Sequence, residues 1–350
     1  MAIYIYMISA LLLYALVIYN LPIGVKSKNR IYLTVVFTVL FSVSAFRGSQ
    51  VGTDTASYQK IFTLALNGNA YLSQEYGFLI FNRFVGLFSK DPQAIVIATS
   101  FVTTLGMVLF IYFNSVNAWL STFLYVTLYY YFFSFNGIRQ FMALSVLLVA
   151  FTFAKRQYWF PFLILLLLAI TIHTTSIVWI AMLYVYYGGP KIRKIVVLNT
   201  VVILVFFLFE SFLSLVTRII PRYSHYTYSP EMEESGGIRT FIVYAFIFLV
   251  ALLFRYIRKI KDYDDLLIIF SLAVSFGLIG YLSSWLAIRV GWMFDIFSVL
   301  LIPQVIEKTF SGFSKYVTYL IVMGIAMMYM LYLLSANFHR VVPYYFYFTR

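Results

Sequence analysis

The 350-residue sequence has no cysteine, which excludes disulfides, thiolate nucleophiles and cysteine-ligated metals. Its three histidines, His173, His225 and His339, are too far apart to match the ligand spacing of a zinc motif. The sequence also shows no acidic cluster suited to Mg²⁺. We therefore expect an activity that uses neither a metal ion nor another cofactor.

Charged side chains are also scarce. They make up 11% of the chain, against 63% hydrophobic residues, whereas soluble domains carry about 25% charged residues. The mean hydropathy is +0.91, and the apolar residues are spread along the whole chain. This distribution excludes a soluble protein with a single anchor. It predicts an all-α, polytopic membrane helix bundle that forms one domain over residues 1–350.

Twelve apolar segments predict about twelve transmembrane helices. They lie roughly at residues 2–20, 31–46, 93–113, 119–135, 138–154, 157–172, 174–187, 195–213, 239–254, 266–283, 286–303 and 316–334. Basic clusters mark every second connection, except for the neutral stretch NSVNAW after residue 113. Lys and Arg collect in cytoplasmic connections, so both termini and the long connections at about 47–92 and 214–238 are predicted to lie outside. The same rule explains the net charge of +13 without a nucleic-acid partner.

Arginine dominates the basic residues of the predicted outer side. Nine of these eleven residues are arginines, whereas lysine is the commoner type on the inner side. A guanidinium is planar, stays charged and matches phosphate with paired donors. The bias indicates a phosphate or pyrophosphate ligand outside the membrane, or else arginines that extend to lipid headgroups.

Two outer connections interrupt apolar stretches at membrane depth: NGIRQ at 136–140, which contains Arg139, and IHTTS at 172–176, which contains His173. Such breaks are tolerated only where they are buried in protein or line a water-filled cavity. They predict a cavity that opens outward. His173 is the candidate general base there, the alternative being a hydrogen-bonded structural histidine.

Arg139 and Arg289 are each expected in the first turn of a helix that runs inward. A helix N-terminus favours anions, so an arginine there suggests that an anion occupies the site. That anion is either a phosphate group of the substrate or a protein carboxylate. The carboxylates available for such a pair are Glu75, Asp54 and Asp295.

The outer connections hold further candidates. Arg47 ends a predicted span, and Asp54 in GTDT is either a site residue or a helix N-cap. Residues 75–90 predict an interfacial amphipathic helix with Glu75, Asn82 and Arg83 on its polar face. The segment 221–239 is interpreted as either a lid or a plain loop.

The motifs RGSQVGTDTASYQKIF, QEYGFLIFNRF, FNGIRQFMALS, IHTTSIVWI and AIRVGWMFDIF occur in this order over most of the chain. Together they resemble the EpsG/Wzy class of bacterial polysaccharide and O-antigen polymerases. The residues that match the family pattern are Arg47, Gly52, Asp54, Tyr58, Glu75, Arg139, Gln140, His173 and Arg289.

The resemblance implies a multi-pass enzyme of the bacterial inner membrane that acts on the periplasmic or outer face, in lipopolysaccharide or exopolysaccharide biosynthesis. Such an enzyme transfers a growing glycan from undecaprenyl pyrophosphate to a new lipid-linked repeat unit. Its partners would be this donor and acceptor, the bilayer, and a chain-length regulator and flippase of the same pathway.

The chemistry of glycan transfer and the family resemblance together predict the roles of individual residues. The leaving pyrophosphate is a stable anion, so arginines can replace a metal ion and a general acid. The base is His173, Asp54 or Glu75. The predicted contacts to the pyrophosphate are Arg47, Arg139, Arg289, Gln140, Tyr58 and Arg83. The alternatives are a ligase that joins glycan to lipid A core and a twelve-helix transporter or flippase for a lipid-linked or anionic solute, although the chain shows no internal repeat.

Overall fold

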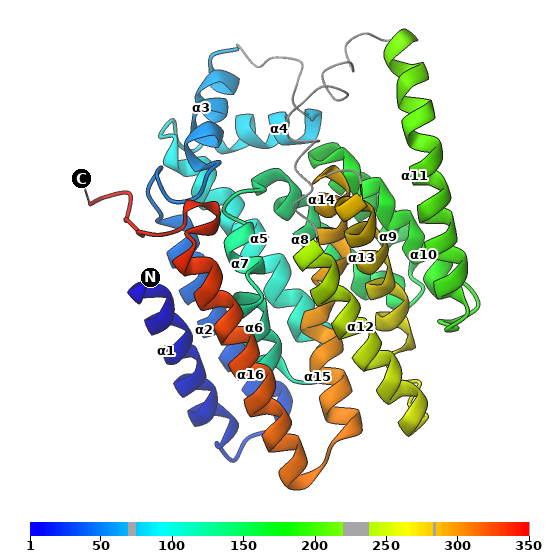
Figure 1. The fold of residues 1–350 in the computed structure, drawn as a ribbon. Coiled ribbons are helices and arrows are strands. Elements are labelled where there is room, and N and C mark those ends of the chain that lie inside the picture. The colour runs from blue at the N-terminus through cyan, green and yellow to red at the C-terminus, as the bar shows by residue number, and fades with distance from the viewer. Residues whose placement is uncertain (69–74, 220–237, 283–284, 350) are drawn as a thin grey trace. The chain divides into compact units, whose positions relative to one another are not determined.

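A computed structural model describes residues 1–68, 75–219, 238–282 and 285–349. Within these residues all regular structure is helical, apart from one isolated β-bridge between Arg47 and Phe346 (Figure 1). The predicted all-α fold is therefore confirmed. The predicted lid, 221–239, lies almost wholly outside the described residues.

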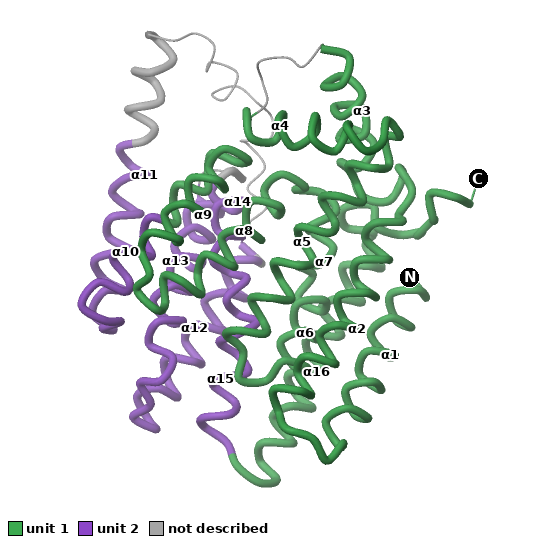
Figure 2. The backbone as a smooth tube through the Cα atoms, turned by 180° about the vertical axis from the view of Figure 1, so that it is seen from behind, with its two compact units in different colours: residues 1–179, 311–350 green, residues 180–310 purple. Residues whose placement is uncertain are grey.

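The chain forms two compact units, residues 1–179 with 311–350 (unit 1) and residues 180–310 (unit 2) (Figure 2). The helices of unit 1 are α1 (Ala2–Tyr19), α2 (Val25–Ala45), α3 (Thr55–Leu66), α4 (Tyr76–Val85), α5 (Gln93–Asn114), α6 (Ala118–Thr127), α7 (Tyr130–Phe133), α8 (Ile138–Lys155), α9 (Trp159–Ile172), α16 (Gly312–Ser335) and the 3-10 helix η4 (Phe338–Arg340). The 3-10 helix η1 (Thr174–Ile180) crosses the boundary of the units. Unit 2 contains α10 (Ala181–Tyr186), α11 (Lys194–Ile219), α12 (Ile238–Arg258), α13 (Asp264–Leu282), α14 (Trp285–Asp295) and α15 (Ser298–Thr309).

Six of the described helices are long and apolar enough to cross a membrane: α1, α5, α8, α12, α13 and α16. The pair α14 and α15 would make a seventh crossing, bent by 41°. Shorter apolar helices are α6, α9, η1 with α10, and the first part of α11. The chain is thus a multi-pass membrane protein, and the count of about twelve spans stays a prediction.

Two predicted spans, 119–135 and 286–303, are not single straight helices. The first is interrupted after α6 at Tyr129, whose φ of 76° is left-handed. This conformation costs an L-residue about 1–2 kcal/mol. Burial of the ring and a 2.9 Å hydrogen bond from the Tyr129 hydroxyl to the Phe338 carbonyl stabilise it. The second span bends between α14 and α15. Hydropathy misses both breaks because the residues on either side are equally apolar.

In unit 1, α5 packs against α2 and α8, and α8 packs against α9. Helices α5 and α8 approach closely at Gly106, where a Cβ would lie 2.6 Å from the carbonyl oxygen of Ser145. Small residues permit such close packing of membrane helices. The connections 47–92, 136–140 and 172–176 meet at one end of these helices. All three connections are predicted to lie on the same, outer side.

The C-terminal tail lies against the connection that follows α2. The Gly48 amide donates to the Tyr345 carbonyl over 2.7 Å, and the Gly52 amide donates to the Arg340 carbonyl over 2.9 Å. Both segments are predicted to be outer. The tail therefore belongs to the same end of unit 1 as the connections that carry the polar breaks.

Helix α4 lies crosswise to α5 beyond that end (Figure 1). Its exposed residues include the large apolar side chains Tyr76, Ile80 and Phe84, which are 71%, 48% and 54% exposed. Asn82, which we expected on a polar face with Arg83, is instead buried and donates to the Phe78 carbonyl over 2.7 Å. The polar face is therefore wrongly predicted at Asn82, whereas Arg83 is exposed as expected. An interfacial position for α4 stays a prediction.

In unit 2, α13 packs against α11, α12 and α14. Arg255 near the end of α12 makes a two-point ion pair with Asp264 at the start of α13, over 2.6 and 2.8 Å. Lys194 at the start of α11 donates to the carbonyls of Tyr184 and Val185 at the end of α10. Both basic residues belong to clusters predicted to be inner, and both stabilise the helix ends of unit 2.

Candidate active site

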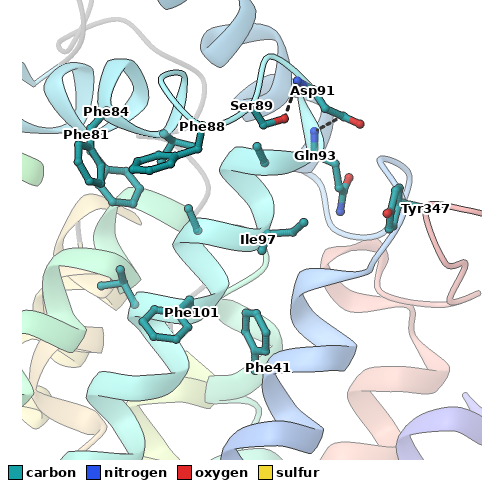
Figure 3. Close-up of a pocket in the computed structure, with 14 residues that line it drawn as sticks. Phe41, Phe81, Phe84, Phe88, Ser89, Asp91, Gln93, Ile97, Phe101 and Tyr347 are labelled. Carbon is teal, nitrogen blue, oxygen red and sulfur yellow. Dashed lines mark hydrogen bonds between the residues drawn. The ribbon is translucent and has the colours of Figure 1, made fainter.

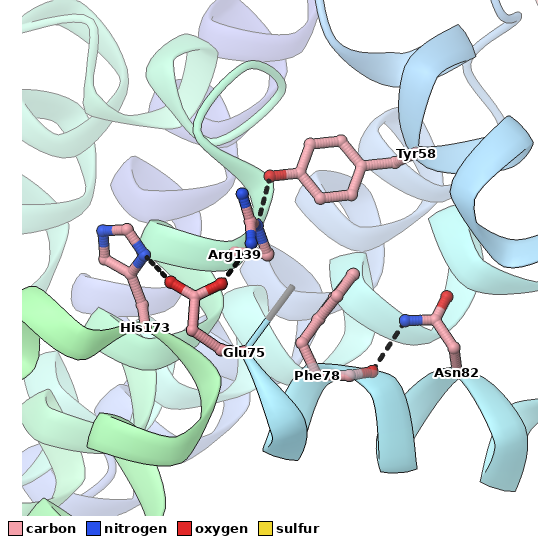
Figure 4. Close-up of polar contacts among 6 residues, drawn as sticks. All are labelled: Tyr58, Glu75, Phe78, Asn82, Arg139 and His173. Atoms are coloured by element: carbon pink, nitrogen blue, oxygen red, sulfur yellow. Dashed lines mark hydrogen bonds and ion pairs between the residues drawn. The ribbon is translucent and has the colours of Figure 1, made fainter. Parts of the chain in front are cut away.

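Four polar side chains from four separate segments meet in unit 1 (Figure 4). Arg139 donates from Nε to the Tyr58 hydroxyl over 3.1 Å and from Nη1 to Oε2 of Glu75. The other oxygen of the same carboxylate, Oε1, lies 3.2 Å from Nδ1 of His173. Glu75 thus connects Arg139 to His173. We call Tyr58, Glu75, Arg139 and His173 the polar cluster.

Helix ends position three of these residues. Glu75 is the extended N-cap of α4, Arg139 is the second residue of α8, and His173 is the extended C-cap of α9. The predicted first-turn position of Arg139 is therefore confirmed. Because backbone direction changes at a helix end, Arg139 and His173 can both point toward Glu75.

The carboxylate of Glu75 is the anion opposite Arg139. The sequence left open whether Arg139 faces a substrate phosphate or a protein carboxylate, and the structure shows the carboxylate. A bound phosphate is therefore not needed to explain a cation in the first turn of α8. The side chains of Arg139, His173 and Glu75 are 26%, 21% and 16% exposed, so the cluster is partly accessible from outside the protein.

The electrostatics of the cluster keep Glu75 ionised. Burial raises the pKa of this carboxyl, but the hydrogen bond from His173 and the charge of Arg139 outweigh that effect and leave the pKa below its usual 4.5. Glu75 therefore stabilises the folded cluster at neutral pH, and this contribution is lost only as the pH falls through the lowered value. Burial raises the pKa of Tyr58, so its phenol remains a neutral partner of Arg139.

An ionised carboxylate can only accept hydrogen bonds. A neutral His173 must therefore donate its Nδ1 proton to Glu75. This tautomer leaves an unprotonated Nε2 on the other side of the ring, directed away from Glu75 (Figure 4). The arrangement provides a proton acceptor whose orientation is held by a carboxylate, which is in turn held by a guanidinium.

The chain matches the model of the EpsG family over residues 30–346. It belongs to the EpsG family. The resemblance predicted from the sequence is thus confirmed. No curated protein and no solved structure matches the chain. The part of the chain that matches the EpsG model contains the whole polar cluster.

Arg47 also matches the EpsG family pattern, but it lies apart from the polar cluster. It is 1% exposed, and its guanidinium donates to Thr55 Oγ1 over 3.1 Å, to the Ser44 carbonyl over 2.5 Å and to Ser100 Oγ over 3.2 Å. The ring of Phe135 lies beneath it at 4.6 Å. Burial lowers the pKa of Arg47 to about 10, which still leaves it charged at neutral pH. In this arrangement Arg47 joins α2, α3 and α5, and its contact with the substrate stays a prediction.

Asn136, which was not predicted as a site residue, and Gly52, which matches the family pattern, fix the connection before α3. The Asn136 side-chain oxygen accepts from the Thr53 amide over 2.6 Å and from its hydroxyl over 2.8 Å. Gly52 has a φ of +89°, and a Cβ there would lie 3.0 Å from the Phe135 carbonyl oxygen. Asn136 is part of the polar break NGIRQ, which was the signal available in the sequence.

The remaining EpsG-motif candidates are placed as follows. Asp54 is the N-cap residue of α3, and Gln140 is buried next to Arg139 on α8. Arg83 is exposed on α4. Asp54 lies one helical turn before Tyr58 of the polar cluster, whose amide donates to the Asp54 carbonyl over 3.0 Å. The role of Asp54 as a base and the roles of Gln140 and Arg83 in substrate binding stay predictions.

Arg289 lies in unit 2, where it is the fifth residue of α14. It is therefore in the second turn, and its predicted first-turn position is wrong because α14 begins at Trp285. Asp295, the other carboxylate considered, is buried and accepts a hydrogen bond from the Tyr244 hydroxyl within unit 2. Among the described residues, no three His, Asp or Glu side chains gather in a metal-binding arrangement.

Proposed function

We propose that this EpsG-family chain is a membrane glycosyltransferase that polymerises lipid-linked repeat units. It would move the glycan from undecaprenyl pyrophosphate to a sugar hydroxyl of the acceptor unit, at the outer face of the bacterial cytoplasmic membrane. The proposal is supported by family membership together with one observation: His173 is aligned by the ionised Glu75 next to Arg139, in a partly exposed cluster.

His173 acts as the general base in this proposal. Its Nε2 removes the proton of the acceptor hydroxyl while that oxygen forms a bond to C1 of the donor sugar. The bond from C1 to the pyrophosphate oxygen breaks, and its electron pair leaves with undecaprenyl pyrophosphate. Glu75 is a positioning residue that stabilises the imidazolium as it forms. Asp54, the N-cap residue of α3, is the alternative base, and His173 is favoured because Glu75 aligns its ring.

The charge of the cluster changes in step with the reaction. Before transfer, the charges of Arg139 and Glu75 cancel and His173 is neutral. After His173 accepts the proton, the cluster carries one net positive charge, at the moment when the pyrophosphate develops negative charge. Positive charge placed near the leaving group stabilises the transition state. Arg289, Gln140, Tyr58 and Arg83 stay proposed contacts to the substrate.

A deletion of the gene in its native strain distinguishes this function from transport. A gel of surface glycans should then show single repeat units on the lipid or surface acceptor, and the wild-type chain should restore the ladder. Loss of all surface glycan, including single units, would indicate a flippase and would contradict the proposal. Loss of glycan from lipid A core with intact free polymer would indicate the ligase.

Polymerisation by the purified chain is expected to survive EDTA. The positive charge opposite the pyrophosphate is supplied by guanidinium groups, which a chelator does not remove. The measurement is the rate of ladder formation from purified lipid-linked units with and without EDTA. A rate that collapses in EDTA and recovers with added Mg²⁺ would show that this assignment of charge is wrong.

A further inference from the structure

An apolar groove of about 560 Å³ lies in unit 1 beside α4 and α5 (Figure 3). Phe81, Phe84 and Phe88 line it on the α4 side, and Ile97 and Phe101 line it on α5. Phe41 of α2 and Tyr347 of the C-terminal tail complete the wall. The volume is in the range of small-molecule sites, which is about 300–1,000 Å³.

The groove is accessible from outside the protein. Phe84, Phe88 and Phe101 are 54%, 77% and 45% exposed, so its aromatic walls are not filled by the protein itself. Asp91 is the only ionisable side chain among the residues that line it apart from the phenol of Tyr347, and no lysine or arginine lines it. An occupant is therefore expected to be a hydrocarbon whose anionic group lies elsewhere.

A continuous row of aromatic rings connects the groove to the polar cluster. Tyr58, which accepts a hydrogen bond from Arg139, packs edge-on against Phe78 at 5.6 Å between ring centroids. Phe78 stacks on Phe81 of the groove at 6.5 Å. Helix α4 has ten residues, so the Glu75 end and the groove end are about 15 Å apart at a rise of about 1.5 Å per residue.

We propose that this groove binds the isoprenoid chain of the lipid-linked donor while its pyrophosphate lies at the Arg139 end of α4. The inference rests on the proposed function. A long polyprenyl chain can run from the cluster to the groove along the exposed apolar side chains of α4, which are Tyr76, Ile80 and Phe84. The phosphate of an ordinary phospholipid held in the groove would instead lie close to Asp91, with no lining cation to balance it. Burial of the chain against the phenylalanines supplies the affinity.

The test uses the full chain purified in nanodiscs. One probe is a synthetic undecaprenyl phosphate with a diazirine midway along its isoprenoid chain, and the second is phosphatidylethanolamine with a diazirine on an acyl chain. After illumination, the labelled peptides are mapped. We expect the polyprenyl probe to label residues 78–102, and we expect excess unlabelled undecaprenyl phosphate to remove this label.

Two variants and a matched control make the result specific. Ala98→Trp fills the groove, and Phe84→Asp places a charge in it at a half-exposed position that should tolerate the change. Ala10→Trp makes the same substitution as the first variant on an exposed position of α1, outside the groove. Each groove variant should reduce labelling about tenfold, equivalent to about 1.4 kcal/mol, and the control should not. If the Ala98→Trp protein does not fold, the labelling of the Phe84→Asp protein alone tests the proposal.

The labelling needs no acceptor and no turnover, so its outcome is independent of polymerase activity. His173→Ala should label normally. Equal labelling of the groove by both probes, without competition by undecaprenyl phosphate, would show that ordinary lipids fill it and would overturn the inference. So would polyprenyl labelling that both groove variants leave unchanged. Specific labelling together with a normal glycan ladder in the deletion strain would support isoprenoid binding in the groove and refute the proposed polymerase function.

Discussion

His173→Ala is expected to slow glycan transfer by about 10²- to 10⁴-fold, which is the usual contribution of a general base, while the lipid donor still binds. The substitution removes the Nε2 acceptor but leaves Arg139 bonded to Tyr58 and Glu75. Transfer is read from the glycan ladder of the variant in the deletion strain and from the rate with purified lipid-linked units. Donor binding is measured separately on the purified protein.

The matched control is Thr174→Ala, which changes the next residue, an exposed one, in the same polar break. It should give a normal ladder, and both variants should reach the membrane at wild-type levels. A normal ladder from His173→Ala would exclude this residue as the base. The role would then pass to Glu75 or Asp54, since these carboxylates are the other candidates.

Arg139→Lys is expected to reduce transfer by about 10²-fold, comparable to the loss of one electrostatic donor from an active site. The guanidinium of Arg139 holds two partners with two different nitrogens, the Tyr58 hydroxyl through Nε and Glu75 through Nη1. An ammonium group is a single point of charge and cannot hold both in the same geometry. Glu75 then loses its fixed orientation, and His173 loses its alignment.

The control for this substitution is Arg156→Lys, an exposed arginine that follows the other end of α8. It should leave the ladder unchanged. Arg289→Lys is measured in parallel, because Arg289 is the other arginine expected to contact the pyrophosphate. Normal ladders from both Arg139→Lys and Arg289→Lys would remove the guanidinium contacts from the mechanism altogether.

The amino-acid sequence by itself determined that the chain is built of apolar helices, and it located the ends of several of them. The apolar stretches correspond to helices such as α5 and α8, because hydropathy and periodicity are properties of neighbouring residues. The polar breaks NGIRQ and IHTTS mark real helix ends for the same reason. The first-turn position of Arg139 follows from such local signals, as does Asp54 as the N-cap residue of α3.

Only the tertiary structure decided which partners these side chains have. Glu75 is 64 residues from Arg139 and 98 from His173 along the chain, so no local pattern could choose it over Asp54 or Asp295 as the counter-ion. Arg47 is also an arginine at the end of a predicted span, yet its side chain is enclosed by α2, α3 and α5. The difference arises from packing, since the cost of burying a guanidinium depends on which oxygens surround it in space, and sequence spacing does not specify them.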